Sequence, residues 1–209
     1  MPVFLLVRHG ENDYVKKGRL AGRLPGVHLN EHGIQQAHRV AEALKAIAQQ
    51  RPVAAIYSSP MERTMETAQP IAEALGCEVI PRQGLLEVDV GDWQDRKLKG
   101  LSRLKVWRAV QFTPSAIRFP GGETFVEAQW RIVRELAELA EKHDPKDTLV
   151  LVTHSDPIKL AIAYFIGVPL DMFQRLAVSP ASISVLYLGE GGARLLALNY
   201  DLSFVLPKP

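Results

Sequence analysis

The sequence contains a single cysteine, Cys77, among its 209 residues. One thiol cannot form an internal disulfide, so the small disulfide-stabilised secreted domains are excluded. Cys77 lies at the start of a strand-like run. We therefore interpret it as a small core residue in a reducing compartment, and we do not expect it to act in catalysis.

Long apolar runs and a strong charge imbalance are absent as well. The run Val3–Val7 is short, follows no basic region and is interrupted by Arg8, which predicts neither a signal peptide nor a membrane span. The formal net charge is only +2, which gives no reason to expect nucleic acid or a membrane as partner. A cytoplasmic location is the expectation.

Nucleotide-binding and metal-binding motifs are also missing. The glycines form neither a Walker loop nor a dinucleotide-binding fingerprint. His28, His32 and His38 have no carboxylate or cysteine beside them at the spacing that metal sites use. We therefore expect no metal and no cofactor.

Apolar runs alternating with helical patterns predict an α/β fold. Strand-like runs are expected at 3–7, 53–57, 78–81 and 148–153, with amphipathic helices between them and a closing hairpin over 182–200 around Gly189–Gly192. This alternation favours one domain with a doubly wound parallel sheet and one antiparallel addition. Asn30 is expected to cap one helix, and Ser59, Pro60 and Glu62 to form the capping-box start of another.

Polar side chains follow two of the most apolar strands directly. Arg8, His9 and Gly10 come after the first, and His154 comes after the run 148–153. Ligands bind beyond the carboxyl ends of strands in such sheets, so the two histidines can meet there. Gly10 is expected to let an anion approach its amide. A pair of loop residues without a role is the simpler alternative for Arg8 and His9.

Two further groups complete the set. Arg63 falls in the first turn of a predicted helix, where free amides and the helix dipole favour anions. Glu87 follows two leucines, and apolar surroundings raise the pKa of a carboxyl toward neutrality. A solvent-facing arginine and a solvated glutamate are the alternatives.

Two segments are candidates for contacts with substrate. Residues 12–29 form a long loop, and ordered loops of this length commonly bind something; Asn12 and Arg23 are its candidate residues. Residues 88–122 are interpreted as a lid insertion, packed down by Trp107 and Phe112. The lid is rich in Lys and Arg, which favours an anionic substrate, although a solvated surface would show the same composition.

Two histidines, two arginines and one glutamate suit phosphoryl transfer through a phosphohistidine. His9 would attack phosphorus, while Arg8, Arg63 and His154 hold the phosphoryl oxygens. Glu87 would protonate the leaving oxygen and later activate water. The planar fork of arginine offers two donors to one phosphate, which lysine cannot do.

These residues resemble the histidine phosphatase superfamily, which also contains the cofactor-dependent phosphoglycerate mutases. The resemblance rests on motifs in order along nearly the whole chain: Arg8-His9-Gly10; Gly22-Arg23 with 26–33 and Gln36-Ala37; Ser58-Ser59-Pro60 with Arg63-Thr64 and Thr67-Ala68; Leu86-Glu87 with Gly91-Asp92-Trp93; Gly121-Gly122-Glu123; and Val152-Thr153-His154. It implies a three-layer α/β/α sandwich with a six-stranded, mostly parallel mixed sheet and a metal-independent mechanism. It also assigns the nucleophile to His9, the phosphate ligands to Arg8, Arg63 and His154, and the acid to Glu87.

The sequence departs from the family pattern at two positions. Val15 stands where the family often has a phosphate-binding Asn, so that contact is missing or comes from Asn12. Ser155 replaces the usual Gly after the second histidine, where it would cap a helix or donate to phosphate. Both substitutions lie beside predicted phosphate ligands.

The resemblance leaves the branch of the family to be decided. Mutases of the family are longer and carry Arg-x-Tyr-Gly after the catalytic Glu, whereas 88–93 reads Val-Asp-Val-Gly-Asp-Trp. The inserted segment also argues against the short members that act on phosphoproteins. We expect a phosphatase for a small anionic phosphorylated metabolite. A phosphomutase and a non-catalytic phospholigand-binding protein are the alternatives, and a homodimer is left open.

Overall fold

The computed structural model describes residues 2–189 and 191–201 and shows a six-stranded sheet in the order β3-β2-β4-β1-β5-β6. The strands are β1 (Val3–Arg8), β2 (Val53–Ser58), β3 (Val79–Pro81), β4 (Thr148–Thr153), β5 (Ile183–Gly189) and β6 (Gly192–Tyr200). The first four strands run parallel, and β5 pairs with β1 antiparallel. The predicted mixed sheet and closing hairpin are confirmed, although Glu190 of the hairpin lies outside the described residues.

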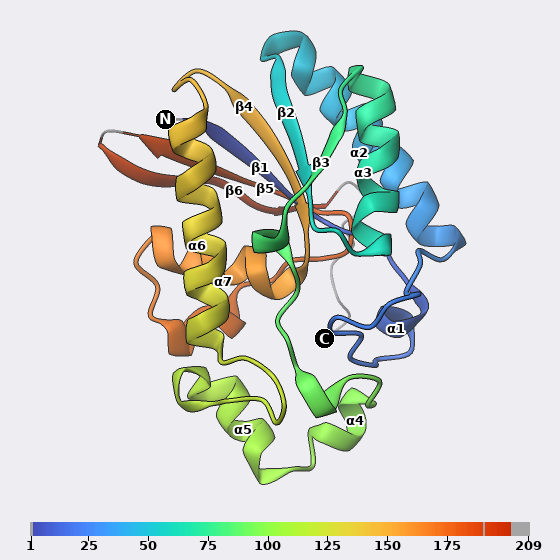
Figure 1. The fold of residues 1–209 in the computed structure, drawn as a ribbon, viewed down its shortest axis with the longest axis vertical. Helices are drawn as coiled ribbons and strands as arrows, with labels where there is room; N and C mark the ends of the chain where they lie inside the picture. The colour runs from blue at the N-terminus through green and yellow to red at the C-terminus, as the bar shows by residue number, and fades with distance from the viewer. Residues whose placement is uncertain (1, 190, 202–209) are drawn as a thin grey trace.

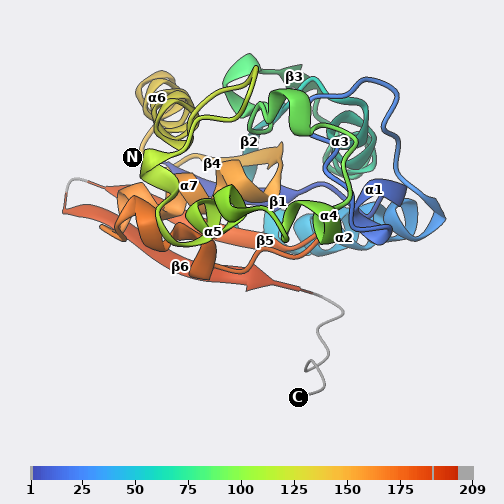
Figure 2. The ribbon, with the colours of Figure 1, turned by 90° about the horizontal axis from the view of Figure 1, so that it is seen from below.

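Alternating side chains of the central strands fill two separate cores, one on each face of the sheet. Phe4 and Leu6 of β1 pack on the face covered by α6 (Phe125–Lys142) and α7 (Ser155–Phe165). Val3, Leu5 and Val7 pack on the opposite face. That face is covered by α2 (Glu31–Gln50) and α3 (Glu62–Leu75), which also pack against each other. The three layers predicted from the sequence are confirmed (Figures 1 and 2).

Capping residues in the sequence predicted the start of α2 and the end of α3 correctly, but not the start of α3. Asn30 caps α2, its side chain accepting from the Gly33 amide, and Gly76 ends α3 in the left-handed conformation. The capping box predicted at Ser59 is wrong, because α3 begins at Glu62 after Met61 with no side-chain cap. The hydroxyl of Ser59 lies 3.0 Å from Nε2 of His154 instead.

Residues 88–122 form a group of short helices at one end of the molecule, at the bottom of Figure 1. They comprise η2 (Gly91–Trp93), α4 (Leu98–Leu101), α5 (Lys105–Phe112) and η3 (Pro114–Ala116). Trp107 stacks on Trp93 with ring centroids 6.1 Å apart, as expected of a packing residue. Phe112 is 66% exposed, so its predicted packing role is wrong. That this segment works as a lid stays a prediction.

Short elements complete the chain: α1 (Asp13–Lys16), η1 (Gln83–Leu85) and η4 (Leu170–Arg175). The loop of residues 12–29 therefore contains one helical turn, capped by Asn12. Over the part of the chain that the structure describes, no helix has the length and apolar character needed to cross a membrane.

Candidate active site

The parallel pairing of β1 with β4 brings the two strand-end histidines together. Arg8 is paired in register with Thr153, so His9 and His154 leave neighbouring strands at the same edge of the sheet. Their ring centroids lie 5.2 Å apart in an edge-to-face arrangement. The two histidines therefore lie close together, as the sequence predicted.

A cavity of about 240 Å³ opens at this edge. Six of the predicted site residues line it: Arg8, His9, Asn12, Arg63, Glu87 and Ser155. Aliphatic side chains of Val15, Leu20, Val88, Val90 and Leu98 form other parts of its wall. The cavity is thus polar at the strand ends and partly apolar around them.

His9 is held in one orientation as a neutral imidazole. Its Nδ1 lies 2.7 Å from the Gly10 carbonyl oxygen, so Nδ1–H donates there and Nε2 keeps its lone pair. Burial, reinforced by the charges of Arg63 and Arg8, holds the pKa of His9 well below its usual value. An unprotonated nitrogen is what nucleophilic attack requires.

Arg8 and Arg63 each donate one hydrogen bond to a backbone carbonyl group and have further donors without a partner in the described residues. Arg8 Nη1 donates to the Val178 carbonyl at 2.6 Å, and Arg63 Nη2 donates to the Gly22 carbonyl at 2.7 Å. Within the described residues, Nε of Arg8 and both Nε and Nη1 of Arg63 are buried without a hydrogen-bond partner. Buried donors of this kind are costly unless an acceptor meets them, and a phosphoryl group would do so.

His154 is fully buried between Ser59 and Glu87. Its Nε2 lies 3.0 Å from the Ser59 hydroxyl, and its Nδ1 lies 3.9 Å from Oε2 of Glu87. Burial and the charge of Arg63 hold the pKa of His154 well below its usual value. His154 is absent from the cavity wall, and its Nδ1 has no hydrogen-bond partner among the described residues, so its role as a neutral donor to the reacting group stays a prediction.

The pKa of Glu87 is in the range that a general acid needs near neutral pH. Burial, followed by the charge of Asp156, raises its pKa to about 7, against the opposing effects of the Val88 amide, Arg63 and Arg8. Its side chain keeps 19% of its surface exposed, so a ligand in the cavity can meet it. A carboxyl with this pKa can give and take a proton near neutral pH.

Asn12 lines the cavity and has a side-chain donor without a partner in the described residues. Its Oδ1 accepts from the Val15 amide at 2.9 Å, which caps α1. Its side chain is fully buried, and Nδ2 has no hydrogen-bond partner in the part of the chain described. Of the two alternatives that the sequence left open, this geometry favours an Asn12 contact with phosphate.

Two expectations about backbone and capping are wrong. The Gly10 amide donates to the Thr67 hydroxyl at 3.0 Å and so does not face an anion; glycine is needed because a Cβ would lie 2.6 Å from the Gly33 carbonyl oxygen. Ser155 is the first residue of α7, whose N-cap is His154, so its side chain does not cap the helix. Ser155 lines the cavity, with its hydroxyl 3.5 Å from the Val178 carbonyl.

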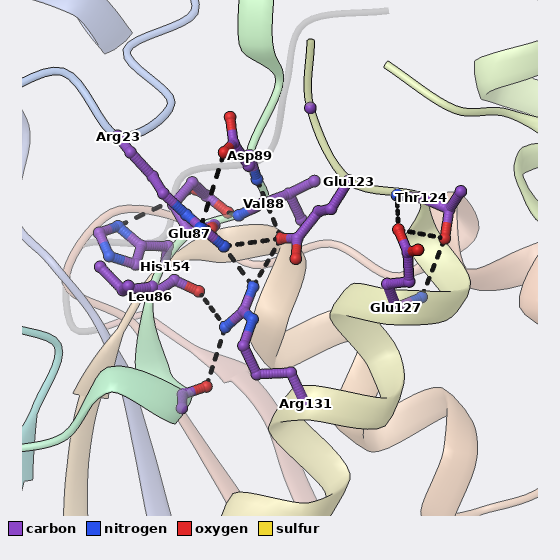
Figure 3. Close-up of polar contacts among 12 residues, drawn as sticks. Arg23, Leu86, Glu87, Val88, Asp89, Glu123, Thr124, Glu127, Arg131 and His154 are labelled. Atoms are coloured by element: carbon purple, nitrogen blue, oxygen red, sulfur yellow. Dashed lines mark hydrogen bonds and ion pairs between the residues drawn. The ribbon is translucent and has the colours of Figure 1, made fainter. Parts of the chain in front are cut away.

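Arg23, which the sequence predicted to contact substrate, contacts other parts of the protein instead. It is absent from the cavity wall. Its Nε donates to the Glu87 carbonyl at 2.8 Å, and its Nη2 donates to Glu123 at 2.9 Å (Figure 3). The loop turns this side chain toward the backbone that carries Glu87, so these contacts do not support a direct contact with substrate.

Some cavity residues were not identified from the sequence. Asp156 was not predicted as a site residue, yet it lines the cavity and contributes to the raised pKa of Glu87. Tyr14 and Arg19 also line it and were overlooked, because a loop has no periodicity that would orient them. Across the described residues, no three His, Cys, Asp or Glu side chains gather in a way that could hold a metal ion.

The model of the histidine phosphatase superfamily (branch 1) matches residues 4–201. The chain belongs to the histidine phosphatase superfamily. It is 32% identical over 201 residues to phosphoserine phosphatase 1 of Hydrogenobacter thermophilus, covering 95% of this chain and 92% of that protein. It is also 31% identical over 199 residues to a 2,3-bisphosphoglycerate-dependent phosphoglycerate mutase of Thermoplasma acidophilum, with the same two coverages.

Solved structures of the superfamily share the whole fold. A phosphoserine phosphatase of Entamoeba histolytica, in complex with 3-phosphoglyceric acid, superimposes with a TM-score of 0.86 at 25% identity, covering 97% of this chain and 98% of that one. A mycobacterial glucosyl-3-phosphoglycerate phosphatase bound to VO3 gives 0.84 at 28% identity, covering 96% of this chain and 100% of that one. Because the chain covers 92% of the Thermoplasma mutase, the expectation that greater length marks the mutases is wrong for this comparison.

Proposed function

We propose that this protein is a metal-independent phosphatase that hydrolyses a small phosphomonoester through a phosphohistidine on His9. The observation that carries the proposal is the pairing of a neutral His9 with a Glu87 carboxyl whose pKa is about 7, in one cavity with unpartnered arginine donors. A purely phosphate-binding protein has no need of such a proton donor.

The first step transfers the phosphoryl group to the protein. Nε2 of His9 attacks phosphorus as the ester P–O bond breaks, and the proton of Glu87 passes to the leaving oxygen. Arg8, Arg63, His154 and Asn12 donate to the non-bridging oxygens, which carry the charge. The products are an alcohol and phosphohistidine with Glu87 ionised.

The second step restores the protein. The Glu87 carboxylate takes a proton from water as the water oxygen bonds to phosphorus. The P–N bond then breaks, its electron pair returns to Nε2 of His9, and inorganic phosphate leaves. Both steps use only side chains of this chain, so we expect activity in the presence of a chelator.

The segment after Glu87 favours a phosphatase over a mutase. A mutase must hold two phosphorylated positions of its substrate in turn, whereas Val88 and Val90 present apolar side chains to the cavity here. The named relatives include both activities, so phosphomutase activity is the second candidate. The small cavity supports a small anionic phosphorylated metabolite as substrate.

The test is release of inorganic phosphate from a panel of phosphorylated glycerates, amino acids, sugars and nucleotides, with chelator present and His9→Ala as control. Release that the substitution abolishes is the expected result. Phosphoryl transfer from 2,3-bisphosphoglycerate to 3-phosphoglycerate without net hydrolysis would assign a mutase instead. Binding without either reaction would assign a non-catalytic protein.

A further inference from the structure

The loop that carries Glu87 has no strand or long helix to fix it. It runs from η1 to η2, yet four consecutive carbonyl groups in it, those of residues 84–87, accept hydrogen bonds from side chains elsewhere in the fold. Thr153, at the end of β4, donates to the Leu85 carbonyl at 2.6 Å. The other three carbonyls are held by two arginines.

Arg131 of α6 makes most of these contacts. Its Nη1 donates to the carbonyls of Gly84 and Leu86 at 2.9 and 2.8 Å, and its Nη2 lies 3.3 Å from that of Glu87. Arg23, from the loop of residues 12–29, donates to the same Glu87 carbonyl through Nε at 2.8 Å. The backbone of Glu87 is therefore fixed from two separate segments of the chain.

Glu123 joins the two arginines. Its Oε1 accepts from Arg23 at 2.9 Å, from Arg131 at 2.7 Å and from the Asp89 amide at 2.9 Å (Figure 3). Asp89 adds a second carboxylate 3.7 Å from Arg23, so two cations face two anions. The three side chains of Arg23, Glu123 and Arg131, here called the Arg23–Glu123–Arg131 cluster, are between 16% and 27% exposed.

The glycine-rich turn before α6 brings Glu123 to this place. The Glu123 amide donates to the Asp89 carbonyl at 3.0 Å, so the two segments touch through their backbones. A Cβ on Gly122 would lie 2.3 Å from that carbonyl oxygen, which no other residue could accept without displacement. The Gly121-Gly122-Glu123 motif therefore packs the turn onto the Glu87 loop.

The cluster also reaches the phosphate side of the cavity. Arg23 follows Gly22, whose carbonyl accepts from Arg63 at 2.7 Å. One short segment thus contacts a proposed phosphate ligand through Gly22 and the Glu87 backbone through Arg23. This arrangement fixes the backbone of Glu87 relative to Arg63.

We infer that Arg23, Glu123 and Arg131 are positioning residues that hold the Glu87 carboxyl in line with the leaving oxygen of the substrate. The inference rests on the proposed function, in which Glu87 is the proton donor. A positioned acid matters for an alkoxide, which leaves with difficulty unless protonated, and matters little for p-nitrophenolate, which is a stable anion. The cluster should therefore act selectively on substrates with poor leaving groups.

The test compares two substrates in Glu123→Gln and Arg131→Met variants. We measure kcat/KM, which reports steps up to phosphoenzyme formation, for p-nitrophenyl phosphate and for the best alkyl phosphate of the panel. We expect kcat/KM for the alkyl phosphate to fall about tenfold further than that for p-nitrophenyl phosphate. The matched control is Arg134→Met, an exposed arginine on the same helix, which should change neither.

Each outcome has one meaning. Equal losses on both substrates, or no loss on either, in variants whose circular dichroism and thermal unfolding show a folded protein would overturn the inference. If Arg131→Met does not fold, Glu123→Gln decides alone, because it keeps the size and an acceptor oxygen of the side chain. Absence of any turnover by the unaltered protein would overturn the proposed function itself and the inference with it.

Discussion

The two halves of the candidate active site are fixed by different means. The proposed nucleophile His9 and the proposed ligand His154 directly follow neighbouring β-strands, and the proposed ligand Arg8 is the last residue of the first strand, so strand pairing sets their positions. Glu87 stands on an irregular loop whose carbonyl groups are held by side chains from distant segments. The first half, here called the strand half, consists of Arg8, His9 and His154 and depends on strand pairing in the sheet. The second, here called the loop half, consists of Glu87 and depends on individual side chains that can be changed one at a time.

The largest effect is expected at the nucleophile. His9→Ala removes the nitrogen that accepts the phosphoryl group, so kcat should fall by at least about 10⁴-fold, the scale on which loss of a covalent nucleophile acts. Phosphate release with the best substrate measures this. Retention of more than a hundredth of the activity would break the assignment of the strand half.

Titration of Glu87, in the loop half, should determine how kcat/KM depends on pH. Because burial and Asp156 raise the pKa of Glu87 to about 7, its protonated form is lost above that pH, and kcat/KM for an alkyl phosphate should fall as pH rises through 7. The pKa of His9 lies well below its usual value, so His9 stays neutral over this range.

Glu87→Gln tests the same assignment directly. The variant should lower kcat/KM for the alkyl phosphate by about 10² to 10⁴-fold, the usual contribution of a general acid, and should abolish the alkaline limb. A profile that keeps this limb in the variant would show that another group titrates there.

A smaller effect is expected at Asn12. Asn12→Ser keeps an acceptor for the cap of α1 and removes the amide donor, so kcat/KM should fall about tenfold, as for loss of one hydrogen bond to a charged group. Adding Val15→Asn to this variant should recover part of the loss, because it returns an amide to the cavity wall. Unchanged kinetics in the single variant would remove Asn12 from the phosphate ligands.

The smallest effect is expected on the surface of the predicted lid. Its seven basic side chains are all exposed, and none lines the cavity: Arg96, Lys97, Lys99, Arg103, Lys105, Arg108 and Arg118. Replacing Lys99, Arg103 and Arg108 together by Ala should change kcat/KM less than about twofold, because exposed charges are screened by salt. A tenfold rise in KM at low salt would instead support the interpretation that lid charge attracts the substrate.

The difference between the two halves also explains which parts of the site could be predicted from the sequence. Apolar strands that end in Arg8-His9 and in His154 were recognisable, because both the run and the residue that follows it are local. The fold followed from the same alternation of strands and helices. Ser59 was misassigned as a cap since its real partner, His154, is far away in sequence.

The loop half was less accessible to sequence reasoning. Glu87 was found by its apolar neighbours, but the side chains that hold its loop come from residues 23, 123, 131 and 153. Arg131 lies within a helix pattern where an arginine normally faces solvent, so nothing local distinguishes it. Arg23 was given a substrate role for the same reason: a loop sequence does not determine which way its side chains point.

The central claim is that the phosphoryl group passes through His9. The most direct measurement is rapid quenching of turnover at alkaline pH, where phosphohistidine survives, followed by mass spectrometry to locate the phosphate. The account predicts phosphate on His9 that forms within the first turnover and disappears when substrate is exhausted. Phosphate on another residue, or turnover that proceeds with no phosphorylated protein at any time, would contradict it.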